Sequence, residues 1–181
     1  DQFHYQPRTP DSFFLDREIL ALGSLTVEVV PTPGHTPGHL AFYFREPEIL
    51  FLGDYDLTPF GPWYGDLYSD IDRTIEPIRR LKAIPARVWL AGHETGLFTH
   101  TPEELWTRYE GVIYERESKL LDFLSVSRTL DDIAEACIVY GRPREPRAFF
   151  EFGERAIMKK HLERLTKNGR ILQEGKYFSP L

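Results

Sequence analysis

The sequence predicts an α/β fold of the α+β kind, in which strands and helices pack around one core or two small ones. Short apolar runs bounded by turn residues fill residues 15–55, and helical periodicity begins near residue 69 and recurs as far as residue 168. A further strand-like run, RVWLAG, follows the first helical segment. With 181 residues, 41% of them hydrophobic, the chain is long enough for such a fold.

The strands are expected to follow one another through residues 15–55. A hairpin turn at residues 22–24 precedes TVEVV (26–30), HLAFYF (39–44) and ILFLG (49–53). Both alternating sets of side chains are apolar in the last two runs, so both faces of these strands should be covered. Helices of this chain can cover one face only, and a second copy of the chain in a C2 dimer is the expected cover for the other.

Two helices are expected next. The first spans residues 69–84 with Ser69 as N-cap, and Pro77 within it predicts a kink or a later start. The second spans residues 101–124, with Thr101 as N-cap, Pro102 as the first helical residue and Glu104 in the first turn. The helical spacing of the first is carried by Ile71, Ile75, Ile78 and Leu81.

The pattern changes after residue 124. A helix capped by Thr129 should end at Gly141, a second should span residues 153–169, and a hairpin turning at Gly175 should close the chain. Two helices followed by a small hairpin resemble a winged-helix module. The sequence therefore predicts two domains, residues 1–124 and residues 125–181.

Composition and charge restrict the classes of partner. The net charge is −6, although residues 140–181 carry an excess of Lys and Arg over Asp and Glu. Glu154 and Glu163 interrupt that basic segment, so a solvated face is the better interpretation and nucleic acid is not the expected partner. No apolar run is long enough to span a bilayer. Cys137 is the only cysteine, which excludes an internal disulfide and a thiolate zinc cluster and fits a cytoplasmic location.

Three strand-like runs each end in a residue that can ligate a metal: His35, Asp54 and His93. Two imidazoles and a carboxylate suit a borderline divalent cation. A single histidine is more often structural than a ligand. Asp54 directly follows an apolar strand, where a carboxylate is costly to bury unless it is paired or binds a cation; its alternative role is a cap of a turn or helix.

Taken together, TPGHTPGH, FLGD and LAGH resemble the last three metal motifs of the metallo-β-lactamase superfamily, over residues 15–98. The resemblance implies the C-terminal half of an αββα sandwich with two zinc ions, iron or manganese being alternatives. By this resemblance His35 completes the first metal site, Asp54 bridges the two metals and His93 ligates the second. It further implies hydrolysis of an ester, thioester or related small-molecule substrate by a metal-bound hydroxide that Asp54, as the catalytic residue, holds in place.

One departure from the family pattern changes the expectation for this chain. The family carries an HxHxDH motif upstream, and no HxH occurs here. Because each zinc needs at least three protein ligands plus water, we expect weak or absent zinc binding, and no activity from this chain alone.

Residues beside the three ligands have predicted supporting roles. His39 is a candidate to orient a ligand, and Tyr55 and Asp56 are candidates to tune Asp54, with a strand-end histidine and a loop cap as the alternatives. His100 and His161 are expected to be structural or surface residues. The loop with Phe60, Trp63 and Tyr64 is a candidate wall of the substrate pocket, the alternative being a loop packed on the helices.

Two other functions compete with hydrolysis. Two histidines and a carboxylate also suit non-haem iron, as in the oxygenase branch of the same superfamily. Alternatively, the winged-helix-like segment makes the chain a non-catalytic binding module for nucleic acid or a protein partner.

Overall fold

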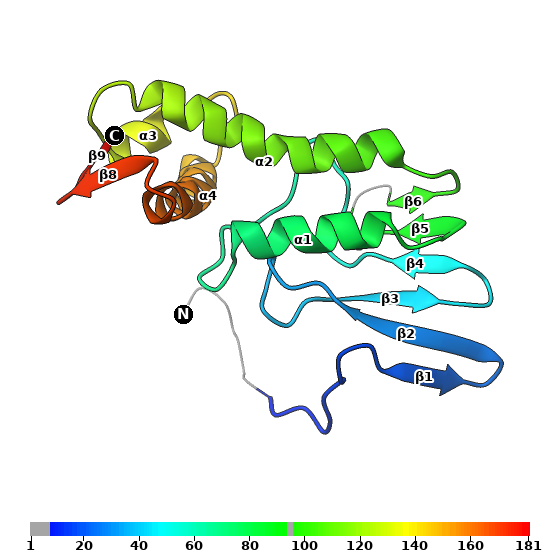
Figure 1. Cartoon of the computed structure of the whole chain (residues 1–181). Coiled ribbons are helices and arrows are strands. Elements are labelled where there is room, and N and C mark those ends of the chain that lie inside the picture. The colour runs from blue at the N-terminus through cyan, green and yellow to red at the C-terminus, as the bar shows by residue number, and fades with distance from the viewer. Residues whose placement is uncertain (1–7, 94–95) are drawn as a thin grey trace.

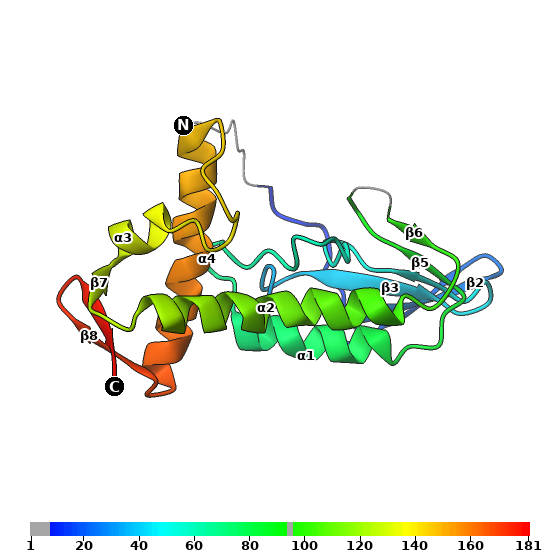
Figure 2. The ribbon, with the colours of Figure 1, turned by 90° about the horizontal axis from the view of Figure 1, so that it is seen from above.

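The computed structural model describes residues 8–93 and 96–181. Six strands form one sheet in chain order, in which β4 and β5 are parallel and all other neighbours are antiparallel. Helices α1 and α2 lie side by side on one face of this sheet (Figures 1 and 2), which confirms the α/β prediction. The strands are β1 (Ile19–Leu22), β2 (Leu25–Pro31), β3 (Leu40–Phe44), β4 (Ile49–Phe51), β5 (Val88–Leu90) and β6 (Leu97–Phe98).

The two faces of the sheet have different surroundings. On the helix side, Ala41, Leu50 and Trp89 are buried in the hydrophobic core. On the opposite side, Phe42 and Phe51 pair across β3 and β4, stack with ring centroids 6.5 Å apart and are only partly buried. No helix covers this opposite face in Figures 1 and 2. We call it the open face, and it agrees with the expectation that helices of this chain cover one side only.

Helix α1 (Ile71–Lys82) runs unbroken through Pro77, so the prediction of a later start was wrong. The proline ring is buried against the core, which offsets part of the lost hydrogen bond. The N-cap is Asp70, whose carboxylate accepts from the backbone N–H of Arg73 at 2.9 Å. Ser69, predicted for that role, instead donates its hydroxyl to the carbonyl oxygen of His35 at 2.6 Å.

Helix α2 (Glu103–Phe123) begins one residue later than predicted from Thr101 as the N-cap and Pro102 as the first helical residue. Pro102 occupies the N-cap position, and no side chain caps the helix, so the assignment of Thr101 was wrong. Glu103 and Glu104 in the first turn place negative charge at the positive end of the helix dipole. The buried side of α2 is apolar apart from one cation, Arg116, whose exposed fraction is 3%.

The C-terminal elements are β7 (Arg128–Thr129), α3 (Leu130–Glu135), α4 (Arg147–Lys167), β8 (Ile171–Glu174) and β9 (Tyr177–Pro180). The strands form a second sheet in the order β7-β9-β8. Thr129 caps α3 through a capping box with Asp132, and Gly169 and Gly175 have positive φ after α4 and in the hairpin, as predicted. Helix α3 ends well before Gly141, and α4 starts six residues earlier than residue 153.

Helix α4 crosses α2 and passes beside the start of α1, joining the C-terminal elements to the rest of the molecule (Figure 2). Arg164 donates to Asp72 on α1 at 2.8 Å and also pairs with Glu117 on α2. Lys160 donates to the carbonyl oxygen of Leu67 at 2.9 Å. Side chains from residues 1–124 and from residues 125–181 belong to one core cluster, and α2 ends at Phe123.

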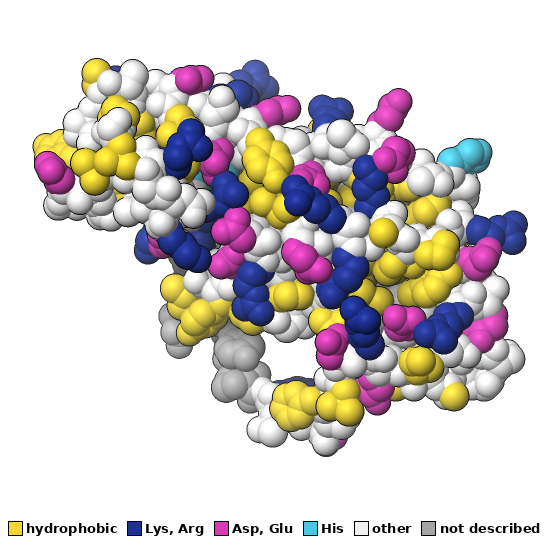
Figure 3. Space-filling view, viewed as in Figure 1, with side chains coloured by type: hydrophobic (Ala, Val, Ile, Leu, Met, Phe, Trp, Pro, Cys, Tyr) yellow, Lys and Arg dark blue, Asp and Glu magenta, His cyan; other side chains and the backbone are white. Residues whose placement is uncertain are grey.

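Charges of both signs alternate over the helices. Figure 3 shows Lys and Arg interspersed with Asp and Glu on the face that carries α1 and α2. Within the part of the chain that the structure describes, no helix combines the length and the apolar character required to cross a bilayer.

A buried polar chain lies where α2, α4 and the loop before α1 meet. Tyr64 Oη accepts from Arg116 Nη1 at 3.1 Å and lies 2.9 Å from His161 Nε2, to which it donates because the Glu117 carboxylate favours a proton on the other ring nitrogen. The neutral imidazole then carries its proton on Nδ1, which lies 3.6 Å from the Glu117 carboxylate. Burial lowers the pKa of His161. The contact with His161 and the Arg164 guanidinium lower the pKa of Glu117. His161 is therefore structural, as expected.

These two pKa shifts predict a fold that loses stability in acid. His161 stays neutral when folded but takes up a proton when unfolded, so the free energy of unfolding should fall as the pH drops below the unfolded-state pKa of about 6.5. One such proton contributes a slope of at most about 1.4 kcal/mol per pH unit. Glu117 adds stability above its unfolded-state pKa that is lost as the pH falls through its lowered folded-state value.

We expect the His161→Gln variant, which can still accept from Tyr64 but cannot titrate, to show a shallower loss of stability between pH 7 and pH 5. Urea unfolding at several pH values measures this slope directly. His100→Gln, an exposed histidine, serves as the matched control. Equal slopes in the wild type and the His161 variant would contradict the assignment.

Candidate metal centre

Three strand ends deliver the predicted ligands to one place. His35 follows β2, Asp54 follows β4 and His93 follows β5. Two glycines permit these turns. Gly34 has φ +133°, and a Cβ there would lie 2.6 Å from the backbone of Thr74. Gly53 has φ +59°, and a Cβ there would lie 2.5 Å from His39 Nε2. A side chain at either position would displace α1 or the histidine beside the site.

The carboxylate of Asp54 lies between two imidazoles. His35 Nε2 is 3.0 Å from Oδ2, and His93 Nε2 is 3.1 Å from Oδ1. Each histidine therefore faces a different oxygen of the same carboxylate. The structure thus brings together all three residues that the sequence singled out.

A hydrogen bond to the backbone fixes the tautomer of His35. Its Nδ1 lies 3.0 Å from the carbonyl oxygen of Trp63. Because a carbonyl oxygen only accepts, Nδ1 must carry the proton, and the neutral ring presents a bare lone pair on Nε2. That lone pair faces Asp54 Oδ2, which also only accepts. Two acceptors at this distance repel unless a proton or a metal cation lies between them.

His39 supports Asp54 from behind. Its Nε2 accepts from the backbone N–H of Asp54 at 2.9 Å, so its Nδ1 carries the proton and donates to Thr32 Oγ1 at 2.7 Å. Burial lowers the pKa of His39 and favours this neutral form. Both ring nitrogens are occupied, so the histidine orients the main chain of Asp54 rather than binding a cation itself.

The other two predicted supporting residues hold loops. Tyr55 is buried and donates its hydroxyl to the carbonyl oxygen of Pro33 at 3.2 Å, in the turn that leads to His35. Burial raises the pKa of this phenol and keeps it protonated. Asp56 accepts from the N–H and hydroxyl of Thr58, at 3.2 Å and 3.1 Å, and caps that turn. Neither side chain has a hydrogen bond to the Asp54 carboxylate.

The three ligands open into a cavity of about 770 Å³. Phe60 and Trp63, two of the three predicted wall residues, line it and stack with ring centroids 6.5 Å apart. Tyr64 is absent from the lining. It is fully buried, because its hydroxyl is directed toward Arg116 and His161 instead of the cavity.

The donor set fits part of a dinuclear metal centre. Two ligands bound to one tetrahedral zinc ion at about 2.0–2.1 Å lie roughly 3.3 Å apart, close to the two histidine–carboxylate distances of 3.0 Å and 3.1 Å. Each carboxylate oxygen could thus share a metal with one imidazole. Across the described residues, however, no three His, Cys, Asp or Glu side chains make a complete site for one ion.

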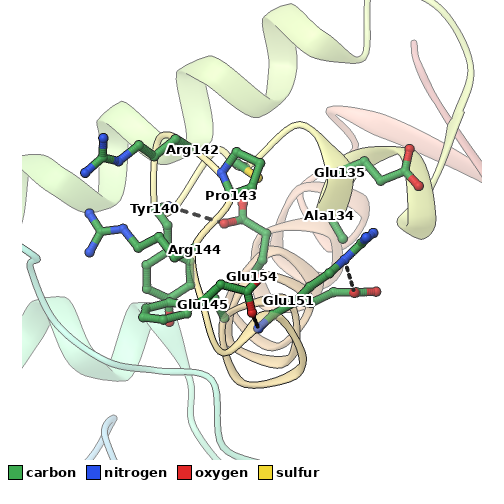
Figure 4. Close-up of a pocket in the computed structure, with 12 residues that line it drawn as sticks. Ala134, Glu135, Tyr140, Arg142, Pro143, Arg144, Glu145, Glu151 and Glu154 are labelled. Atoms are coloured by element: carbon green, nitrogen blue, oxygen red, sulfur yellow. Dashed lines mark hydrogen bonds and ion pairs between the residues drawn. The ribbon is translucent and has the colours of Figure 1, made fainter.

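A second cavity, of about 340 Å³, lies between α3 and the start of α4 (Figure 4). In Figure 4 the side chains of Arg142 and Arg144 extend in the same direction, away from Glu151 and Glu154. The Glu154 carboxylate is buried and accepts from the backbone N–H groups of Val139 and Tyr140. The aromatic ring of Tyr140 packs 5.7 Å from that of Phe60, so this region supports the wall of the metal-site cavity.

Sequence reasoning missed three groups that hold this centre. The carbonyl oxygen of Trp63 fixes His35, Thr32 fixes His39, and Arg116 holds the pocket wall. A backbone acceptor has no signature in the sequence. Arg116 stands at core spacing with Tyr109, Ile113 and Leu120, but arginine is rarely buried, so the residue type hides that position.

Comparison with known proteins places these residues in a family. The model of the metallo-beta-lactamase superfamily matches residues 2–93. Hydroxyacylglutathione hydrolase from Rhodospirillum rubrum is 35% identical over 86 residues, which cover 46% of this chain and 32% of that protein. An atrochrysone carboxyl ACP thioesterase from Aspergillus fumigatus is 26% identical over 91 residues, covering 50% and 28% of the two chains.

Solved structures extend the likeness to nearly the whole chain. A metallo-beta-lactamase family protein from Thermus thermophilus superposes with a TM-score of 0.77 and 26% identity, covering 97% of this chain and 56% of the other. A beta-lactamase domain protein from Burkholderia ambifaria shares the fold, with a TM-score of 0.73 and 16% identity. The chain spans less than two thirds of the length of each of these relatives. From the family match and the shared fold together, the chain belongs to the metallo-beta-lactamase superfamily.

Proposed function

We propose that this chain carries the His35, Asp54 and His93 portion of a zinc-dependent hydrolase centre. The observation that supports it is the Asp54 carboxylate, set between the Nε2 atoms of two histidines at the mouth of a cavity. A carboxylate with one imidazole on each oxygen is better suited to bridging two cations than to forming a surface ion pair. The fixed tautomer of His35 leaves the Nε2 lone pair directed at Asp54 Oδ2, where a cation would be needed between the two acceptors.

The proposed substrate is a small thioester or a related ester. Of the two curated relatives described above, one is a hydroxyacylglutathione hydrolase and the other is an ACP thioesterase. In this chain, Phe60 and Trp63 offer a stacked aromatic wall beside Asp54. Such a wall suits the apolar part of an acyl group and excludes water from it.

Each residue has a distinct role in this proposal. Zinc, when bound, supplies a Lewis acid that brings the pKa of a water molecule to about 7. His35 and His93 would offer their Nε2 lone pairs to the metal. Asp54 would accept a hydrogen bond from the attacking water or hydroxide and so orient it. His39 holds the main chain of Asp54, so the carboxylate keeps its direction.

The chain by itself is proposed to bind zinc weakly and to be inactive. On each side of Asp54 it supplies one imidazole and one carboxylate oxygen, whereas a catalytic zinc ion takes three protein ligands. Iron and manganese remain alternatives to zinc because the same donor types suit them.

Residues 125–181 are proposed to form a winged-helix-like module that stabilises the pocket wall. Helices α3 and α4 are followed by the β8–β9 hairpin, in the order that such modules share. The Tyr140–Phe60 and Tyr64–His161 contacts join it to the loop beside the metal centre. Arg155 and Arg164 on α4 pair with carboxylates of this chain, which favours this role over binding of nucleic acid.

A zinc titration followed by NMR tests the proposed centre. We expect weak binding that perturbs the imidazole signals of His35 and His93 and leaves those of His100 and His161 unchanged. Asp54→Ala should weaken binding at least about tenfold, the lower end of the effect of altering groups around a bound metal. Asp66→Ala, an exposed aspartate that also follows a glycine, is the control.

Two results would contradict this proposal. If zinc left the His35 and His93 signals unchanged, the centre would not be a metal site. If the purified chain retained one or two zinc ions tightly, or hydrolysed a hydroxyacylglutathione thioester with zinc, the centre would be complete and the proposed incompleteness wrong.

The open face of the sheet is proposed to bind a second copy of this chain as a C2 dimer. Phe42 and Phe51 stack there in partial contact with solvent, and Leu97 on the sheet edge is 60% exposed. Light scattering should give a dimer for the wild type and a monomer for Phe51→Lys. Leu172→Lys, an exposed leucine on β8, should leave the dimer intact. A monodisperse wild-type monomer would contradict the proposal.

A further inference from the structure

Arg116 is a buried cation without a carboxylate partner among the described residues. Its exposed fraction is 3%, and it lies on the core side of α2. Burying a guanidinium is costly unless its donors are all satisfied, and most buried arginines pair with an acid. The groups that satisfy Arg116 therefore indicate what this cation is for.

Every side-chain hydrogen bond of Arg116 to the described residues goes to the segment 60–64. Nη2 donates to the carbonyl oxygen of Phe60 at 2.6 Å, and Nη1 donates to the carbonyl oxygen of Pro62 at 3.3 Å. Nη1 also donates to Tyr64 Oη at 3.1 Å. The guanidinium carbon lies 4.6 Å from the ring centroid of Phe60 and 5.7 Å from that of Tyr64. One side chain thus fixes two carbonyl groups, one hydroxyl and two rings of five consecutive residues.

The same segment determines the tautomer of a proposed metal ligand. The carbonyl oxygen of Trp63, next to the one that Arg116 holds at Pro62, accepts the Nδ1 proton of His35 at 3.0 Å. Successive carbonyl groups in this segment are therefore divided between the guanidinium and the imidazole. If the segment moved, His35 would lose its acceptor and could place its proton on Nε2, where Asp54 Oδ2 lies 3.0 Å away.

We propose that Arg116 is a positioning residue: by holding the segment 60–64, it keeps the Nε2 lone pair of His35 free for a metal ion. The inference rests on the proposed function, because a free Nε2 lone pair is useful only if His35 binds a metal. It needs no metal for its test, because the tautomer of His35 is a property of the chain itself.

The experiment compares imidazole ¹⁵N chemical shifts in the metal-free chain at pH 8.5, about two units above the ordinary histidine pKa. These shifts distinguish a proton on Nδ1 from one on Nε2. In the wild type we expect His35 to carry its proton on Nδ1. In Arg116→Met we expect it largely on Nε2, and we expect the zinc affinity measured by the same NMR titration to fall about 10–100-fold.

Three further variants separate positioning from simple stability. Arg116→Lys keeps the charge but has one donor group, so both tautomers of His35 should be populated. Tyr64→Phe removes the link to His161 but leaves the two carbonyl contacts of Arg116, so His35 should keep the wild-type tautomer. Arg108→Met, an exposed arginine on the same helix, should change nothing.

A wild-type tautomer of His35 in a folded Arg116→Met variant would overturn the inference. If Arg116→Met does not fold, the Arg116→Lys variant is measured instead. A wild-type tautomer of His35 together with an unchanged zinc affinity in that variant would also overturn the inference. Failure of the proposed function has a different signature, in which the tautomer changes as expected but zinc perturbs neither His35 nor His93 in the wild type.

Discussion

The structure around the proposed site depends on one electrostatic constraint: a carboxylate held between two imidazoles at the ends of three strands. Asp54 can occupy this position because β4 pairs with β3 on one side and with β5 on the other. The parallel β4–β5 pairing brings the ends of these two strands to the same edge of the sheet, and with them Asp54 and His93. The turn after β2 then carries His35 to the opposite oxygen of the carboxylate.

Several features of the fold and the site could be predicted because they depend on the types of side chain within a short stretch of sequence. The apolar strands ending in a ligand, the Thr129 cap and the glycines after α4 and in the final hairpin each have a local physical cause. Other features depend on tertiary contacts. Ser69 looks like a helix cap, but its hydroxyl bonds to the carbonyl of His35, which becomes available only when β2 and α1 meet. The two-residue strands β6 and β7 are too short to show any periodicity.

The supporting groups of the site illustrate the limit of sequence reasoning more sharply. His39 could be nominated from its spacing, yet its action is on the backbone N–H of Asp54, which any residue at that position would offer. Tyr64 was expected in the pocket wall because its neighbours Phe60 and Trp63 are there. Its side chain points the other way because Arg116 and His161 provide partners for its hydroxyl inside the core. Whether an aromatic residue in such a loop faces inward or outward depends on partners far along the chain.

The Tyr64–His161 hydrogen bond joins residues 97 positions apart in the sequence. Contacts between residues so far apart raise the contact order, which slows folding. Because α4 carries His161, loosening α4 would free one end of the segment 60–64, while Arg116 on α2 would still hold two of its carbonyl groups.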